Sequence, residues 1–222
     1  EELGVDAHKV LVLSNAADPS VFDPARVNGD VRERCGLTTH VVGFAGRFLP
    51  WHGLELLVEA MPSVLREVPA AMFLFVGDGP ERPRIEADLA RRGLARYAVF
   101  VGHIEHERLP AYLAAFDVAV LPHSNAYGSP MKLFEYMAMA KPTGAPRLGP
   151  VEAALTHGET GLLFEPRDVA DMSRALVTLL TDDALRSRLG ARAREYVVHE
   201  RNWGRNADAV LALARAVGRR AP

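Results

Sequence analysis

Two charged residues stand close together in an apolar stretch, residues 127–142, which reads YGSPMKLFEYMAMAKP. They are Lys132 and Glu135, three positions apart, so on a helix they project from the same side. Two interpretations are open. The pair forms a salt bridge on a narrow exposed strip. Alternatively, that side of the helix faces a polar cavity, in which Glu135 accepts hydrogen bonds from hydroxyl groups.

The same stretch has the signals of a buried helix. Ser129 followed by Pro130 predicts a serine N-cap with proline at the first helical position, and Pro142 predicts the end of the helix. Almost every residue between them is apolar, so we expect a helix that is buried nearly all round. Gly128, Ser129 and the N–H groups of the first turn would then be turned toward an anion.

Three further polar loops follow apolar runs of strand length. The first, RFLPWHG (47–53), ends where a helical pattern begins, so Arg47 and His52 would add positive charge for a phosphate beside a helix N-terminus. An ordinary strand-to-helix turn with Arg47 in solvent is the alternative. The second loop, GDGPER (77–82), has the residues of a tight turn before a helix, and we favour that interpretation.

The third loop, GHIEHER (102–108), contains His103 and His106. Either histidine would serve as a general base or a ligand contact, although exposed loop histidines usually have no special role. The backbone of this loop would border a planar base. The four loops together outline one candidate site.

Short apolar runs alternating with amphipathic segments must position these loops. The runs are apolar on both faces, as buried parallel strands are. The expected strands are 9–13, 41–46, 71–77, 98–102, 118–122, 142–146 and 161–164. The expected helices are 54–68, 81–93, 106–116, the stretch with Lys132, 149–158, 168–182, 183–200 and 203–220. This alternation predicts an α/β fold with a doubly wound parallel sheet, whose ligands bind outside the carboxyl ends of the strands.

The alternating core covers residues 9–167, and a helical tail covers residues 168–222. The chain has no internal repeat, low-complexity tract or obvious linker, so we expect residues 1–222 to form a single domain. Its 222 residues and 49% hydrophobic content suffice for a sizeable core.

The charge and the cysteine content of the chain limit the kinds of ligand and the cellular compartment that we expect. A formal charge of −2 and a pI near 6.5 argue against nucleic acid. The single cysteine, Cys35, cannot form an internal disulfide, and no spaced Cys/His set predicts a metal, so we expect a cytoplasmic protein without cofactors. No run approaches the roughly 18 apolar residues of a membrane span, and the first residues lack the features of a signal peptide.

With these residues in view, the chain resembles the C-terminal, nucleotide-sugar-binding domain of group 1 (family 4) glycosyltransferases, retaining enzymes whose GT-B fold has two facing Rossmann-like domains. The resemblance covers nearly the whole chain, and the order and spacing of its segments are highly specific. The segments are KVLVLSNAADPSVF, GFAGRFLPWHGLELLVEA, FLFVGDGPERPRIE, VFVGHIEHERLPAYLAAFDVAVLP, SPMKLFEYMAMAKP and HGETGLLFEPRDVADMSRAL.

The resemblance implies a role for each matched residue. Arg47 and His52 would hold the donor diphosphate, and the backbone of His103 and Ile104 would contact the nucleobase. Glu135 matches the second glutamate of the family's Glu, seven residues, Glu motif and would bind the ribose hydroxyls. The residues that would offer amide groups to phosphate or sugar are Gly128, Ser129, Pro130 and Met131.

The sequence departs from the family pattern in three places. Tyr127 occupies the position of the first glutamate, so the usual acidic contact with the transferred sugar is absent and Tyr127 is the expected sugar contact. His52 replaces the usual lysine and is expected to be a weaker cation that titrates near neutrality. The segment from Asn15 to Asp18 lacks the usual glycine. The first two departures leave the donor and the activity open.

The expected function is therefore donor binding in a retaining glycosyltransferase, which transfers a sugar from a nucleoside diphosphate to an acceptor hydroxyl. Arg47, His52, Lys132 and helix N-termini would stabilise the departing diphosphate, and no general base is identified. Because the chain starts at Glu1 and shows no N-terminal acceptor-binding domain, we expect an excised domain that binds nucleotide weakly and does not turn over. The helix at 203–220 would return toward that partner domain, and the intact enzyme could act at a membrane surface.

Two alternatives remain open. Another GT-B enzyme, such as a sugar-nucleotide epimerase, would need acid/base carboxylates and histidines in its cleft, and SPMKLFEYMA argues against it. A non-catalytic α/β nucleotide-binding or interaction domain would have Tyr127 and His52 as marks of a decayed site.

Overall fold

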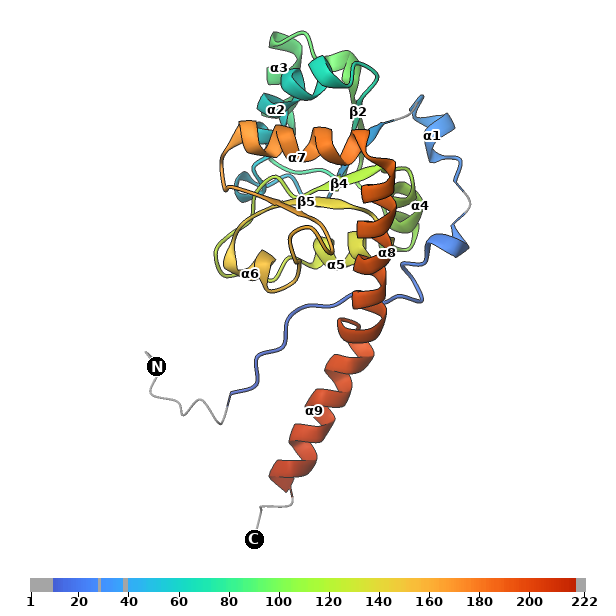
Figure 1. Ribbon diagram of the computed structural model, residues 1–222, viewed down its shortest axis with the longest axis vertical. Helices are drawn as coiled ribbons and strands as arrows, with labels where there is room; N and C mark the ends of the chain where they lie inside the picture. Colours follow the sequence, from blue (N-terminus) through green and yellow to red (C-terminus); the bar gives the residue numbers. More distant parts are fainter. Residues whose placement is uncertain (1–9, 28, 38–39, 219–222) are drawn as a thin grey trace.

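A single parallel sheet organises the chain. The computed structural model describes residues 10–27, 29–37 and 40–218 (Figure 1). Its six strands are hydrogen bonded in the order β3-β2-β1-β4-β5-β6, and every pair is parallel. The strands are β1 (Val41–Ala45), β2 (Met72–Val76), β3 (Ala98–Gly102), β4 (Val118–Val120), β5 (Thr143–Pro146) and β6 (Leu162–Phe164).

This arrangement confirms the prediction of a doubly wound, Rossmann-like α/β sheet. The strand order reverses between the neighbours β1 and β4, which makes their carboxyl ends the topological switch point where such sheets bind ligands. Each of the six strands agrees with its expected range to within two residues.

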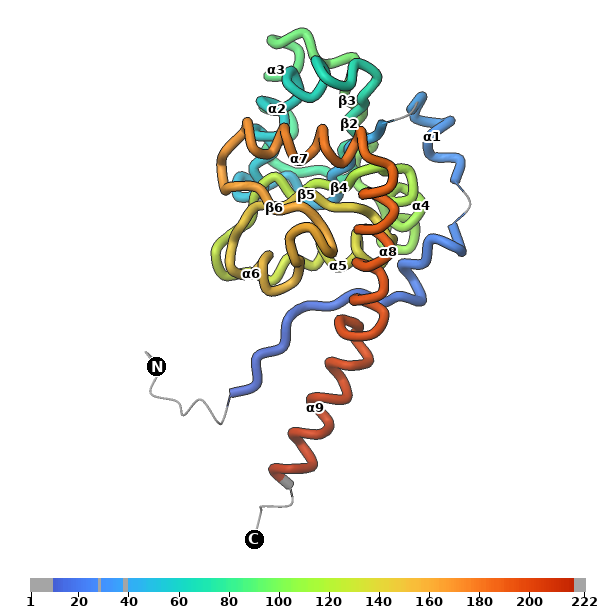
Figure 2. Tube along the Cα trace, viewed as in Figure 1, coloured from blue at the N-terminus to red at the C-terminus, as the bar shows by residue number. Residues whose placement is uncertain are grey.

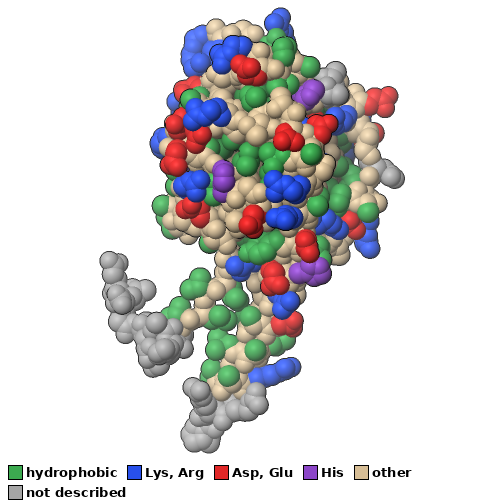
Figure 3. All heavy atoms as spheres, in the orientation of Figure 1, with side chains coloured by type: hydrophobic (Ala, Val, Ile, Leu, Met, Phe, Trp, Pro, Cys, Tyr) green, Lys and Arg blue, Asp and Glu red, His purple; other side chains and the backbone are tan. Residues whose placement is uncertain are grey.

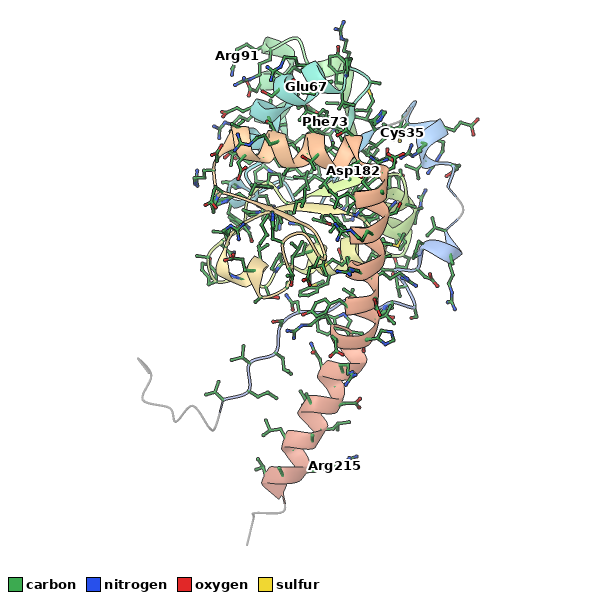
Figure 4. All side chains as sticks on the ribbon, in the orientation of Figure 1. Cys35, Glu67, Phe73, Arg91, Asp182 and Arg215 are labelled. Atoms are coloured by element: carbon green, nitrogen blue, oxygen red, sulfur yellow. The ribbon has the colours of Figure 1, made fainter. Side chains whose placement is uncertain are left out.

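Helices cover both faces of the sheet because the residues of each strand are apolar on both sides. Val42 and Phe44 of β1 pack in one core with α2 (Leu54–Glu67), α3 (Arg82–Arg91) and α7 (Val169–Thr181). Val41 and Ala45 pack in the other core, with α4 (Leu109–Ala114), α5 (Met131–Ala138), α6 (Gly149–Glu152) and α8 (Asp183–Glu200). Figure 4 places Phe73 of β2 in the interior and Arg91 of α3 at the outer edge.

Some expected helices differ in extent. The segment 106–116 begins as a 3-10 turn, η5 (His106–Arg108), and becomes α-helical only as α4. The helix expected at 149–158 ends at Glu152, since the chain beyond it forms a turn in which the N–H of Thr156 donates to the Thr160 hydroxyl. Four short helical segments were not predicted: η2 (Pro24–Arg26), α1 (Val31–Arg34), η3 (Pro50–His52) and η4 (Ala95–Tyr97).

The strand expected at 9–13 is wrong for residues 10–13, and residue 9 lies outside the described residues. These residues have no strand partner and are exposed, with Val12 at 83%. The end of this segment lies beside α9 (Trp203–Gly218; Figure 2). Leu13 and Val210 line one hollow there. A strand needs the free backbone N–H and C=O groups of a sheet edge as hydrogen-bond partners. The backbone groups of α9 are bonded within the helix, so α9 cannot pair with a strand. Residues 219–220 of the expected last helix lie outside the described residues.

Candidate functional site

Three loops enclose a cavity beside the carboxyl ends of β1, β2 and β3. The cavity has a volume of about 780 Å³, and its lining includes Arg47 from the first loop, Asp78 from the second, and His103 and Ile104 from the third. Arg47 is exposed, and within the described residues its guanidinium has no hydrogen bond or ion pair. His103 and Ile104, which follow β3, therefore share one cavity with an unpaired guanidinium.

The second loop supports the first. The N–H of Phe48 donates to the Asp78 carbonyl over 2.9 Å, and the N–H of Gly46 donates to the Val76 carbonyl over the same distance. Gly77 has φ of +122°, and a Cβ there would lie 2.1 Å from the Gly46 oxygen. The glycine is thus required by close backbone packing as well as by a turn, and the loop at 77–82 fixes the position of the loop that bears Arg47.

Lys132 extends from α5 across the start of the first loop. Its Nζ lies 2.8 Å from Nε2 of His52 and 5.1 Å from the centre of the Phe44 ring. A Cβ at Gly46 would lie 2.7 Å from Cε of Lys132, so the lysine passes directly over that glycine. Burial lowers the pKa of Lys132 to about 8, although Glu135 opposes the shift.

Lys132 does not form an ion pair with Glu135, so the salt-bridge interpretation is wrong. Glu135 is only 8% exposed. Burial raises the pKa of its carboxyl, while His106 and Lys132 act in the opposite direction. Among the residues that the structure describes, none donates a hydrogen bond to this carboxylate. It is a buried acceptor without a protein donor.

His52 is not the titrating cation that its place in the sequence predicted. Its Nδ1 lies against the Arg47 carbonyl and its Nε2 against the Lys132 ammonium. Burial, followed by the nearby Lys132 charge, lowers the pKa of His52 to about 4. The imidazole is therefore neutral at pH 7, because both its surroundings and its neighbour disfavour a second proton.

Ser129 is not the N-cap of α5. The helix begins at Met131 without a side-chain cap. The Ser129 hydroxyl instead accepts from the N–H of Asn15 over 3.0 Å, and its carbonyl accepts from Nδ2 of Asn15 over 2.7 Å. No local pattern reveals this partner, which is 114 positions away. The uncapped first turn leaves the N–H groups of Met131 and Lys132 without helical partners.

The remaining predicted residues precede α5. The N–H of Gly128 donates to Oδ1 of Asn125, and Pro130 has no N–H to offer. Tyr127 is 89% exposed. None of these residues lines the cavity of the first three loops. The structure thus joins Arg47, His52 and Lys132 through direct contacts, places Glu135 one helical turn further along, and leaves Tyr127 in solvent.

Two residues to which the sequence assigned no role in the site belong to this arrangement. Asn15 holds the loop before α5, and Phe44 underlies the Lys132 ammonium.

Among the helices that the structure describes, none is long and apolar enough to cross a membrane.

The comparisons with known proteins agree with the fold and with one family. The family model for group 1 glycosyl transferases matches residues 39–182. The α-D-kanosaminyltransferase of Streptomyces kanamyceticus is 28% identical over 95% of this chain and 54% of its own length. A D-inositol 3-phosphate glycosyltransferase of Stackebrandtia nassauensis is 33% identical over 97% of this chain and 51% of its own. The chain therefore spans about half the length of these curated relatives.

A solved structure gives the same fold. Anabaena HepE in complex with UDP and glucose has a TM-score of 0.83 and 21% identity, over 96% of this chain and 59% of that one.

Proposed function

The chain belongs to the group 1 glycosyltransferases, and on this premise we propose that it binds the nucleoside-diphosphate sugar of a retaining enzyme. In the whole enzyme, the sugar would pass from the diphosphate to an acceptor hydroxyl. Family membership favours this function over that of a sugar-nucleotide epimerase.

The observation that supports donor binding most is the Glu135 carboxylate. It is buried, its pKa is raised by that burial, and within the described chain it accepts no hydrogen bond. A buried carboxylate without donors is costly unless a ligand supplies them. We assign the ribose hydroxyls of the donor to this role, since a pair of hydroxyls offers two donors to two carboxylate oxygens.

The diphosphate would lie between the first loop and α5. The positive groups available are the unpaired Arg47 guanidinium, the Lys132 ammonium, and the N–H groups of the first turn of α5. They would stabilise the charge that develops on the diphosphate as the sugar becomes oxocarbenium-like. We propose that these groups suffice without a metal cofactor.

The nucleobase would enter the cavity of about 780 Å³, against the backbone of His103 and Ile104. HepE, which shares the fold, was solved with UDP and glucose. That complex supports the use of nucleoside diphosphates as probes for this chain. The sugar contact at Tyr127 remains a proposal, and from its exposed position the side chain would have to fold inward.

An apolar surface offers a place for the acceptor-binding domain. It comprises the exposed apolar residues of segment 10–13 and of α9 (Figure 3), and its members include Leu13, Trp203, Val210 and Leu211. Exposed apolar patches of this kind mark interaction surfaces. We propose that the acceptor-binding domain covers it in the whole, cytoplasmic enzyme, and that this chain alone binds nucleotide without turnover.

Calorimetric titration of UDP, GDP and ADP tests donor binding. We expect one of the three to bind, and Glu135→Gln to weaken that binding about tenfold, the loss of roughly one hydrogen bond to a charged group. Glu195→Gln on the exposed surface of α8 is the matched control. If none of the three binds, the protein is better described as a non-catalytic interaction domain. Unchanged affinity in Glu135→Gln would refute the ribose assignment.

A further inference from the structure

The contacts of the His52 ring determine where its proton lies. A backbone carbonyl can only accept a hydrogen bond, so Nδ1, which faces the Arg47 carbonyl, must be the protonated nitrogen. An ammonium can only donate, so Nε2, 2.8 Å from Nζ of Lys132, must be the bare nitrogen. The ring is thus a neutral acceptor by geometry alone.

Aromatic rings hold this imidazole in place. The centre of the His52 ring lies 5.7 Å from that of Phe44 and 5.9 Å from that of Trp51. The Phe44 ring also faces the Lys132 ammonium at 5.1 Å. An ammonium has three donors. One N–H of Lys132 is directed to His52, and one side of the ammonium lies against Phe44. Lys132 therefore keeps at least one N–H donor for an anion in the space beside Gly46.

Burial and the charge of Lys132 keep His52 neutral, while Glu135 favours the charged form of Lys132. Glu135 faces Lys132 from the next turn of α5, His106 faces Glu135 from η5, and the Arg47 carbonyl faces His52. The pKa of His52 is lowered to about 4 and that of Lys132 to about 8. Between those values the pair consists of a neutral histidine and a charged lysine.

We infer that His52 is a positioning residue, whose imidazole accepts a hydrogen bond from Lys132 and fixes the ammonium toward the donor diphosphate. The inference rests on the proposed donor-binding function. In this arrangement His52 makes no contact of its own with phosphate, and its effect on binding operates only through Lys132.

A double-mutant cycle on nucleotide affinity tests this dependence. With UDP, GDP or ADP, whichever binds wild type, His52→Phe removes the acceptor and should weaken binding about tenfold, and Lys132→Met should weaken it at least as much. His52→Phe/Lys132→Met should be no weaker than Lys132→Met alone. His52→Gln, which keeps an acceptor near the place of Nε2, should restore affinity to within about threefold of wild type. His199→Phe, at an exposed position of α8, is the matched control.

The pH profile adds a readout that packing alone would not move. Wild-type affinity should fall as the pH rises through about 8, where Lys132 loses its proton, and Lys132→Met should lack this fall. Losses that multiply in the double variant, or a His52→Phe variant that binds as wild type does, would overturn the inference.

Nitrogen NMR of the unliganded wild-type protein decides the same point without any nucleotide. At pH 7 we expect His52 with a protonated Nδ1 and a bare Nε2, and a changed Nε2 signal in Lys132→Met. A proton on Nε2 would overturn the inference whether or not the variants fold. If no nucleotide binds but this signature is found, the proposed function fails while the His52–Lys132 contact stands.

Discussion

Nζ of Lys132 lies 2.8 Å from Nε2 of His52, a residue 80 positions away, and forms no ion pair with Glu135 on its own helix. A buried carboxylate and a partly buried ammonium therefore lie near each other without forming an ion pair. Such an arrangement reduces stability in the absence of a ligand. Ionisable groups with shifted pKa values and incomplete hydrogen bonding are characteristic of binding sites, where a ligand supplies the missing contacts.

Replacement of Lys132 by methionine should stabilise the protein. Its pKa of about 8 lies below the ordinary 10.5, so between these values the unfolded chain binds more protons than the folded one. The free energy of unfolding contributed by Lys132 therefore rises with pH in that window. We expect Lys132→Met to gain about 1–3 kcal/mol at pH 7 and to lose this rise. Urea unfolding at pH 7 and pH 10 measures both.

Lys141 provides the matched control for that experiment. Burial also lowers its pKa to about 8, but its Nζ donates to the carbonyls of Ala114 and Phe116, each over 2.8 Å. Lys141→Met would leave both carbonyls without this donor, so we expect it to destabilise the protein by about 1–3 kcal/mol. If both variants changed stability in the same direction, the distinction between a lysine bonded to one imidazole nitrogen and a lysine bonded to two backbone carbonyls would be wrong.

Asn15 should affect the phosphate end of the site and not the nucleoside end. Asn15→Asp replaces the Nδ2 donor to the Ser129 carbonyl by a carboxylate, which repels that carbonyl and shifts the start of α5. We expect about fivefold to tenfold weaker binding of the nucleoside diphosphate and unchanged binding of the nucleoside. Asn206→Asp, which removes a similar bond to the Ser14 carbonyl, is the control. Equal losses for nucleoside and diphosphate would argue against this role.

The end of α5 contains a strained alanine. Ala140 has φ of +54°, and the N–H groups of Ala140 and Lys141 donate to the carbonyls of Met137 and Tyr136. This is a Schellman motif with alanine at the position that favours glycine. We expect Ala140→Gly to raise the free energy of unfolding by up to about 1 kcal/mol, since relief of the strain exceeds the added flexibility of the unfolded chain.

Thermal and urea unfolding of Ala140→Gly should be compared with Ala191→Gly in α8, where the same replacement removes a helix-favouring residue. The control should lose about 1 kcal/mol. A loss of stability in both variants would show that Ala140 adopts its conformation without strain.

The sheet was predictable because its strands are buried on both faces. Val41 and Val42 enter opposite cores, so the whole strand reads as a continuous apolar run with turn residues after it. The same rule failed at residues 10–13, where an apolar run has no sheet edge beside it. The corner at Asp182, which caps α8 by accepting from the Leu185 N–H, was placed correctly from local spacing (Figure 4).

The candidate site was predictable in its residues but not in its contacts. Spacing placed Lys132 and Glu135 on one side of a buried helix, which the structure confirms for Glu135 at 8% exposure. Their partners come from distant parts of the chain. Ser129 is hydrogen bonded to Asn15, and Lys132 to His52. In the described residues, Ser129 therefore does not cap α5, Lys132 forms no salt bridge with Glu135, and His52 is not a second cation. Local patterns carry no information about such long-range hydrogen bonds.

A crystal structure of the chain with the tightest-binding of UDP, GDP and ADP tests the central claim most directly. We predict both ribose hydroxyls within hydrogen-bond distance of the Glu135 carboxylate, and a phosphate oxygen within that distance of Nζ of Lys132, with His52 still bonded to the lysine. A nucleotide bound elsewhere, or one whose ribose leaves Glu135 without a donor, would contradict the donor-site account.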